Sequence, residues 1–427
     1  MKRTIISVAL FLTIAIATDA QAPITRGIMA PPPTANTQPS STTDRTASRD
    51  RTLRRTRRPT QPGQAHTTRI NYNKYNKALV DAANKGDAEA QLALGNFYYR
   101  GEGVTASVEQ AYQWWCKAAD NDKTQAMLMA GICDYFGLGT KENKYQAYDQ
   151  FRKASMNNNY SAMQYLGDCY RFGHGTTKDY QQALHWYRKS AEGGNDDGQY
   201  RYGQALQQGL GCEKDYQQAL EWFQKAAKQG HTGAMAEIGL AYYDGLGVEQ
   251  SCEKATEWFN KAAKEDEEIA EFGLGRCYLD GCGVEQDDTK AFEWFNKAAA
   301  QGHPDAQGYV GYCYENGIGV EKNLSEAVKW YTKGAEGGFA WARYRLGYCF
   351  WQEPNTGVRH TDFDKFAFES FQKAHDEGSA DGTFYLGLCY YYGIHVSKSK
   401  SKGRELIAEA SAKGSAKAAE WMAVNKK

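Results

Sequence analysis

Cysteine is the reactive side chain that this 427-residue sequence places most regularly, and it occurs ten times. Six of the ten share one register of a repeating pattern, two residues after a recurring glycine: Cys133, Cys169, Cys277, Cys313, Cys349 and Cys389. Neighbouring helices pack about 8 to 10 Å apart and equivalent helices of successive repeats lie farther, whereas a disulfide needs Cα atoms about 5.5 to 6 Å apart. We therefore expect these six side chains to be unpaired and buried as small apolar residues.

The other four cysteines stand at different points of the repeat: Cys116, Cys212, Cys252 and Cys282. These four are candidates for local disulfides, and Cys116 with Cys133 is one pair to consider. An exported chain would favour such bonds, because disulfides persist in oxidising compartments.

Catalytic and metal-binding motifs are much weaker than the cysteine pattern. The chain has no Gly-x-Ser-x-Gly motif, and its eight histidines are scattered, with His231 and His303 each following the glycine that ends a repeat. Seven Gly-x-Gly pairs resemble phosphate-binding loops, but their repetition in one place is better explained by helix capping. We predict that the chain is not an enzyme and has no catalytic residue, no cofactor and no metal.

A glycine that recurs every 36 residues sets the frame for all other positions. This marker glycine stands at Gly95, Gly131, Gly167, Gly203, Gly239, Gly275, Gly311 and Gly347, and at Gly387 after a step of 40. A Gly-x-Gly pair begins six residues after most marker glycines, and an alanine recurs with the same period, as at Ala219 and Ala255. Nine copies in phase predict a repeat protein.

Each copy contains two helical patterns with one apolar stripe each. Ala162 and Leu166 share an arc with the marker Gly167, and Phe223 shares one with Ala219, at about 100° per residue. We expect the aromatic residues to be mostly core, with six tryptophans at one register filling the space between helix pairs: Trp114, Trp186, Trp222, Trp258, Trp294 and Trp330.

A hairpin of this length cannot bury its apolar surface alone, so neighbouring hairpins must stack. The predicted fold class is all-α: a right-handed superhelical α/α solenoid of about nine 36-residue helix-turn-helix repeats. Half-repeat caps are expected at both ends, over residues 72–85 and 415–424.

The first 70 residues differ from the repeats. Residues 1–20 resemble a secretory signal peptide, with Lys2 and Arg3 before an apolar stretch that is shorter than the ~20 residues of a membrane span. Residues 21–70 hold seven of the nine prolines and nine arginines against two aspartates, and we interpret them as a disordered linker. Its basic cluster, Arg54 to Arg58, is either a solvated tether or a contact for an anionic surface. Residues 71–427 form the repeat region, and their 40 basic and 48 acidic residues argue against a nucleic-acid partner.

The repeat resembles a known family. Its pattern, seen in the fifth copy at Ala234, Gly239, Tyr242, Trp258 and Phe259, is similar to the Sel-one-like repeat (SLR), a relative of the tetratricopeptide repeat (TPR). The resemblance covers about residues 72–424 and implies an adaptor that binds proteins. A cysteine-rich branch of the family carries a disulfide pair in each repeat and is credited with weak β-lactam hydrolysis, but that paired spacing is absent here.

A binding surface is expected on the first helix of each hairpin. Offsets −3, +1, +4 and +5 from the marker glycine point away from the core arc and should line the inner surface of the solenoid. They are polar in copies three and four, as at Gln164, Asp168 and Gln204. In other copies they are aromatic, and these are our candidate partner-binding residues: Tyr135, Phe136, Tyr344, Tyr348, Trp351, Phe384, Tyr391 and Tyr392. The alternative is that the insertion at 351–364 covers the C-terminal ones as local core.

These observations predict an exported scaffold, periplasmic or extracellular, without a transmembrane span in the mature chain. Its partner would be a protein or peptide, or a cell-wall or envelope component, held on the concave face. Two other functions stay open at this point. One is a weak β-lactam or cell-wall hydrolase, and the other is a surface adhesin that uses the basic segment.

Overall fold

A computed structural model describes residues 70–352 and 363–425, and every secondary-structure element in these residues is an α-helix. The predicted signal peptide and nearly all of the predicted linker lie outside the described residues. The described residues divide into two units, with the boundary between residues 159 and 160, and each unit is described by itself.

The first unit contains a single helix followed by two helix pairs. The helices are α2 (Lys77–Asn84), α3 (Ala88–Arg100), α4 (Val108–Asp120), α5 (Thr124–Phe136) and α6 (Lys144–Met156). The helix α2 is a second helix without its first, as the half-repeat at 72–85 predicts.

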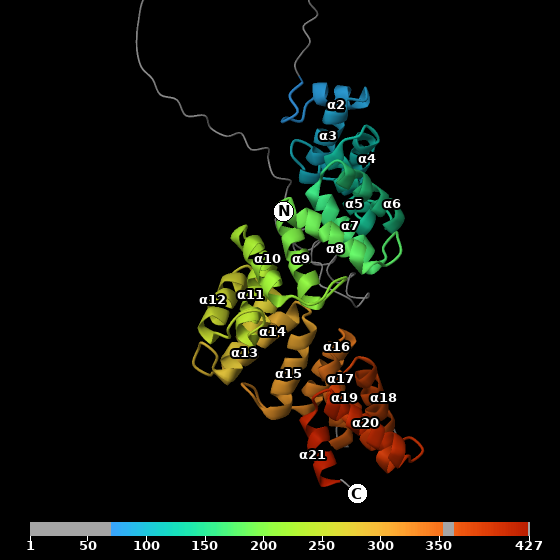
Figure 1. The fold of residues 1–427 in the computed structure, drawn as a ribbon. Helices are drawn as coiled ribbons and strands as arrows, with labels where there is room; N and C mark the ends of the chain where they lie inside the picture. Colours follow the sequence, from blue (N-terminus) through green and yellow to red (C-terminus); the bar gives the residue numbers. More distant parts are fainter. Residues whose placement is uncertain (1–69, 353–362, 426–427) are drawn as a thin grey trace, which may run out of the picture. The chain divides into compact units, whose positions relative to one another are not determined.

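The second unit contains seven helix pairs followed by a single helix (Figure 1). Its first four pairs are α7 (Tyr160–Phe172) with α8 (Tyr180–Glu192), α9 (Asp196–Gln208) with α10 (Tyr216–Lys228), α11 (Thr232–Asp244) with α12 (Cys252–Ala263), and α13 (Glu268–Asp280) with α14 (Asp288–Ala300). Three more pairs follow: α15 (Pro304–Asn316) with α16 (Leu324–Glu336), α17 (Ala340–Gln352) with α18 (Phe363–Asp376), and α19 (Ala380–Tyr392) with α20 (Lys400–Ala412). The unit ends with α21 (Ala416–Val424). The nine pairs confirm the all-α repeat solenoid.

The Gly-x-Gly turn joins the two helices of a pair and also contacts the preceding repeat. Gly245 ends α11 in the left-handed region, with φ of 69°, and its N–H bonds to the carbonyl of Ala241. Gly247 also has a positive φ of 73°, and a Cβ there would lie 2.5 Å from the carbonyl carbon of Tyr216. The first glycine therefore caps a helix, whereas the second allows its turn to lie close against the preceding repeat.

The second helix begins at a polar cap that closes the turn. The carboxylate of Asp215 accepts a hydrogen bond from the N–H of Gln218, and the N–H of Asp215 donates to the carbonyl of Leu206 in the preceding helix. Ser251 and Asp287 cap the next two second helices in the same way. These bonds satisfy amide groups that a helix end would otherwise leave unpaired.

The marker glycine is required by the core. A Cβ at Gly239 would lie 2.5 Å from the ring of Phe259, which is fully buried in the second helix of the same pair. Gly311 faces Tyr331 and Gly203 faces Phe223 in the same manner. The period of 36 residues therefore records a repeated contact between one glycine and one ring.

The prediction that the six tryptophans fill the space between pairs is confirmed in part, since Trp222, Trp258, Trp294 and Trp330 pack against the core of adjoining pairs without being fully buried. Only Trp114 is buried, and the others are half-buried. The ring one residue later occupies the core, as Phe223 does beside Trp222. The lysine three residues after each tryptophan covers the indole, and Lys225 Nζ lies 3.4 Å from the centroid of Trp222.

In the second unit, successive first helices pack directly on one another, as α7 on α9, α11 on α13 and α15 on α17. Successive second helices of the described chain make no comparable contact. First helices therefore line one side of the stack, which we call the first-helix face. Second helices line the opposite side, the second-helix face.

The cysteines follow the prediction in part. All six at the marker register are buried. Cys252 and Cys282 form a disulfide that joins the start of α12 to the turn of the following repeat, with their Cα atoms 4.9 Å apart. The suggested pair of Cys116 with Cys133 is wrong, because both are free thiols.

Candidate functional site

Three of the aromatic residues predicted to bind a partner are buried instead. Tyr344 is 1% exposed, Phe384 6% and Tyr135 2%. Tyr344 and Phe384 stand three residues before the marker glycine, a position that lies between successive first helices, and Tyr344 stacks on Tyr385 of α19 with ring centroids 5.6 Å apart. The helical angles of Tyr344 and Phe384 placed these side chains away from the core of their own hairpin. The angles took no account of the neighbouring repeat, which covers them.

Tyr135 is covered within its own repeat. Its ring lies edge-on to Phe136 at 4.8 Å, and Lys144 Nζ sits 3.9 Å above it and donates to its carbonyl. Phe136 itself is half-buried.

The other predicted residues keep some surface. Tyr348 and Tyr391 are half-buried, and Tyr392 is 53% exposed. Tyr391 lies edge-on to Trp421 of α21 with centroids 5.0 Å apart. The side chain of Trp351 and most of the insertion at 351–364 lie outside the described residues, so the expectation for them stays a prediction.

Four rings and one arginine, of which only Tyr348 was predicted, gather on the first-helix face of α15 and α17. We call this group the aromatic patch: Tyr309, Tyr312, Trp341, Arg345 and Tyr348. All five are half-buried. Tyr309 and Trp341 stack with centroids 5.4 Å apart and planes 25° apart, although they come from successive repeats.

Arg345 is the centre of the aromatic patch. Its guanidinium carbon lies 5.7 Å from the ring centroid of Tyr312, 5.8 Å from Trp341 and 5.2 Å from Tyr348. Its guanidinium is paired with Glu315, which also accepts a bond of 2.5 Å from the hydroxyl of Tyr331. Burial opposes the charge of Arg345, but the bonds to Glu315 hold its pKa above the usual value.

Further ion pairs flank the aromatic patch. Lys417 lies 2.9 Å from Asp381, and Arg343 lies 2.7 Å from Glu377. Each of these cations has a carboxylate partner, as Arg345 has. The aromatic patch therefore offers rings and hydroxyl groups rather than net charge.

The same face is polar on α7, α9 and α11. We call this region the polar ladder: Asp168, Arg201, Gln204 and Glu237. Arg201 Nε lies 3.8 Å from Asp168, and the amide of Gln204 donates to Glu237 at 3.2 Å. Burial raises the pKa of the Glu237 carboxyl, while hydrogen bonds from Gln204 and Gln207 work in the opposite direction.

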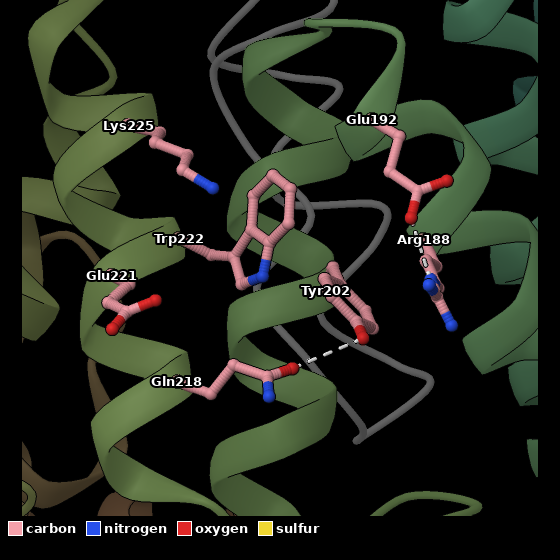
Figure 2. A pocket seen from close by; sticks show the side chains of 7 residues that line it. All are labelled: Arg188, Glu192, Tyr202, Gln218, Glu221, Trp222 and Lys225. Carbon is pink, nitrogen blue, oxygen red and sulfur yellow. Dashed lines mark hydrogen bonds and ion pairs between the residues drawn. The ribbon is translucent and has the colours of Figure 1, made fainter.

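A cleft of about 360 Å³ opens on the second-helix face, between α8 and α10. Figure 2 shows its lining: Arg188, Glu192, Tyr202, Gln218, Glu221, Trp222 and Lys225. The side chain of Tyr202 rises from α9 between the two second helices, edge-on to Trp222 at 5.4 Å. We call this site the outer cleft.

Comparison with known families decides the identity of the repeat. The Sel1 repeat model matches nine segments: 88–123, 124–159, 161–195, 196–231, 232–267, 269–303, 304–339, 342–379 and 380–415. The chain belongs to the Sel1 repeat family. Sel1 repeat proteins are generally scaffolds for protein interactions and typically not enzymes.

Two solved structures are similar to this Sel1 repeat chain over most of their own length. One is a protective antigen of uropathogenic Escherichia coli strains with an SLR fold, which is 29% identical over 80% of this chain and 79% of that one, with a TM-score of 0.51. The other is a Sel1 repeat protein from Oxalobacter formigenes, 28% identical over 57% of this chain and 96% of that one, with a TM-score of 0.52. No curated protein matches the chain.

Features of a catalytic centre are weak in the described part of this Sel1 repeat chain. Within residues 70–352 and 363–425, no three His, Cys, Asp or Glu side chains gather as a metal site requires. Ser251 and Lys254 have the Ser-x-x-Lys spacing of β-lactam-recognising enzymes, but the Ser251 hydroxyl accepts the N–H of Lys254 as a helix cap. None of the described helices has the length and apolarity to cross a bilayer.

Sequence reasoning missed most of the aromatic patch. Tyr309 and Arg345 stand two residues before a marker glycine, and Trp341 stands six before one, at offsets that the helical angles did not single out. For Tyr309 the signal was present as a change of composition, because it occupies the register of Arg201 and Glu237 in the polar ladder.

Proposed function

We propose that this Sel1 repeat protein is an exported scaffold that binds an extended segment of a partner protein on the aromatic patch. The observation that carries the proposal is the group of half-buried rings around Arg345 on α15 and α17. Tyrosine, tryptophan and arginine are the residue types that dominate binding energy at protein interfaces.

The aromatic patch is pre-organised for binding. Arg345 is fixed by Glu315, and Trp341 is fixed by its stack on Tyr309, so little side-chain entropy is lost when a partner arrives. Rings in fixed positions favour partner segments that bring apolar surface without long flexible side chains.

The ion pairs in and beside the aromatic patch also limit which partner segments fit. Since Arg345, Lys417 and Arg343 all have carboxylate partners, neither a strongly acidic nor a strongly basic segment gains a new ion pair. Uncharged segments rich in proline or aromatic residues fit best, because aromatic-lined grooves bind extended proline-rich chains.

The test is capture of partners from the native envelope fraction by crosslinking, comparing the mature protein with its Trp341→Ala variant. We expect recovery of the main partner to fall about 30-fold, as truncation of an interface hot spot costs about 2 kcal/mol or more. Gln204→Ala is the matched control on the polar ladder and should change recovery less than about twofold. Equal capture by Trp341→Ala and the unsubstituted protein, with unchanged helicity, would refute the proposal.

We also propose that the protein is exported to the periplasm or the cell exterior. Support comes from the apolar stretch after Lys2 and Arg3 and from the disulfide between Cys252 and Cys282, since such bonds are rare in reducing compartments. The intact mass and N-terminal sequence of protein recovered from fractionated cells check this. A start near residue 21 in the envelope or medium supports export, whereas a chain retained in the cytoplasm with Met1 contradicts it.

A further inference from the structure

Asp305 is a carboxylate without a partner beside the aromatic patch. It stands in the first turn of α15, six residues before the marker glycine, and is half-buried. Tyr309 follows four residues later, so the two side chains lie on the same side of the helix. Among the described residues, no basic nitrogen lies within 4.0 Å of the Asp305 carboxylate and no hydrogen bond reaches it.

The other carboxylates at this register all bind a basic residue of the following repeat. Glu89 lies 2.5 Å from Lys123, Asp197 lies 3.3 Å from His231, and Asp381 lies 2.9 Å from Lys417. The repeat that follows Asp305 supplies no such residue. Phe339 stands at the position of Lys123 and His231, and Trp341 stands at the position of Lys417. Asp305 therefore keeps the carboxylate of these pairs and lacks their cation.

Arg276 of α13 is the cation whose charge acts on Asp305, but it is bound to another carboxylate. Its guanidinium pairs with Asp244 at 3.2 Å. The charge of Arg276 and the charges of two carboxylates, Asp280 and Asp305, all act on the hydroxyl of Tyr309. With Asp244 there are three carboxylates for one cation, so this end of the aromatic patch is net negative.

We propose that the partner segment on the aromatic patch carries one basic residue, whose cation pairs with Asp305. This inference rests on the proposed function and specifies its partner. The basic residue gives Asp305 what the following repeat gives the equivalent carboxylates, and its neighbours in the segment lie on the stacked rings of Tyr309 and Trp341. The rest of the segment is uncharged, because the cations in and beside the aromatic patch are already paired.

The state of Asp305 in the free protein favours such a partner. Burial raises the pKa of the Asp305 carboxyl to about 6, and the charge of Arg276 only partly opposes this. The charged carboxylate is therefore poorly stabilised until a cation arrives. Arginine suits the position better than lysine, because its planar guanidinium can bond to both carboxylate oxygens and lie against a ring.

The first test is selection of a random peptide library, displayed on phage, against the mature protein. We expect the enriched peptides to combine proline or aromatic residues with one arginine at a fixed distance from them. Selection against Asp305→Asn should enrich the same apolar pattern without the arginine. Enriched peptides that lack a basic residue overturn this inference and leave the proposed function standing. Enrichment of nothing, or of the same peptides by Trp341→Ala, overturns the proposed function and this inference with it.

Fluorescence anisotropy with the most enriched peptide then tests the ion pair itself. Asp305→Asn, and glutamine in place of the arginine of the peptide, should each weaken binding about tenfold. Both changes together should weaken binding no more than either alone, because the two groups act on each other. Asp288→Asn removes a carboxylate from the first turn of α14 and is the matched control, which should leave the affinity unchanged. Additive losses, or an equal loss in Asp288→Asn, overturn the pairing with Asp305.

Discussion

The polar ladder and the aromatic patch share registers of the first helix of a repeat, yet hydrogen-bonded polar side chains make up the first and mainly aromatic rings the second. Arg201 and Gln204 of α9 correspond to Tyr309 and Tyr312 of α15. Both regions rest on an unchanged core contact between a marker glycine and a ring, at Gly203 and at Gly311. The comparison teaches that the repeat fixes the core and leaves the residues on the first-helix face open to change.

The first prediction asks whether the core contributes equally beneath the two regions. Gly239→Val and Gly311→Val should each lower the free energy of unfolding by about 3 kcal/mol, because the new side chain would meet the ring of Phe259 or Tyr331 at 2.5 and 2.8 Å. Urea unfolding followed by circular dichroism measures both. Tolerance of one substitution and not the other would break the equivalence.

The second prediction concerns the joint between the regions. The disulfide of Cys252 with Cys282 ties the repeat of the polar ladder's Glu237 to the next one toward the aromatic patch. Replacing both cysteines by serine should destabilise the protein by about 2 to 3 kcal/mol. Reductant should destabilise the unsubstituted protein by a similar free energy, which is seen as a lower melting temperature. It should leave the melting temperature of the double variant unchanged.

The third prediction concerns the carboxylate of Glu315, which accepts from Arg345 and Tyr331 beside the aromatic patch. Glu315→Ala should cost about 2 kcal/mol in unfolding free energy, because it leaves Arg345 and the Tyr331 hydroxyl without their acceptor. Tyr331→Phe tests the hydroxyl alone and should cost less. Equal stability of Glu315→Ala and the unsubstituted protein would show that solvent replaces the carboxylate.

The fourth prediction is a difference in pH dependence. The folded pKa of Glu237 is raised by burial, so the folded state binds the proton more tightly than the unfolded state. The contribution of Glu237 to stability is present below the unfolded pKa of about 4.5 and is lost as the pH rises through the folded value. The protection of the α11 amides, measured relative to their intrinsic exchange rates, should therefore fall across that window. Glu237→Gln should remove this pH dependence of the protection. Exchange of α17 serves as the internal control.

The smallest expected effect lies on the second-helix face. Lys333 Nζ is 4.0 Å from the centroid of Trp330, and Lys333→Met should cost about 0.5 kcal/mol in unfolding free energy. The midpoint of urea unfolding measures it. A loss of stability comparable to that of Glu315→Ala would mean that the lysines over the tryptophans support the core rather than only shield the indoles.

Much of the fold could be predicted because its signals are local. The marker glycine, the Gly-x-Gly pair and the recurrent alanine lie within one hairpin, and each is tied to a short-range requirement such as a positive φ or a close ring. The register of the buried cysteines followed from the same pattern. The prediction that the tryptophans fill the space between pairs held only in part, because Trp222 and Phe223 both lie on the broad apolar arc of their helix and only packing decided that Phe223 is the one fully buried.

The candidate site was less predictable because it depends on contacts between repeats. Sequence alone determined that nine hairpins stack and that aromatic residues concentrate in the later copies. The tertiary structure decided that Tyr344 and Phe384 are covered, that Trp341 and Arg345 gather with Tyr348, and that Cys252 meets Cys282 across a repeat boundary. Helical periodicity specifies the direction of a side chain from its own axis, whereas its burial depends on which neighbouring helix lies in that direction.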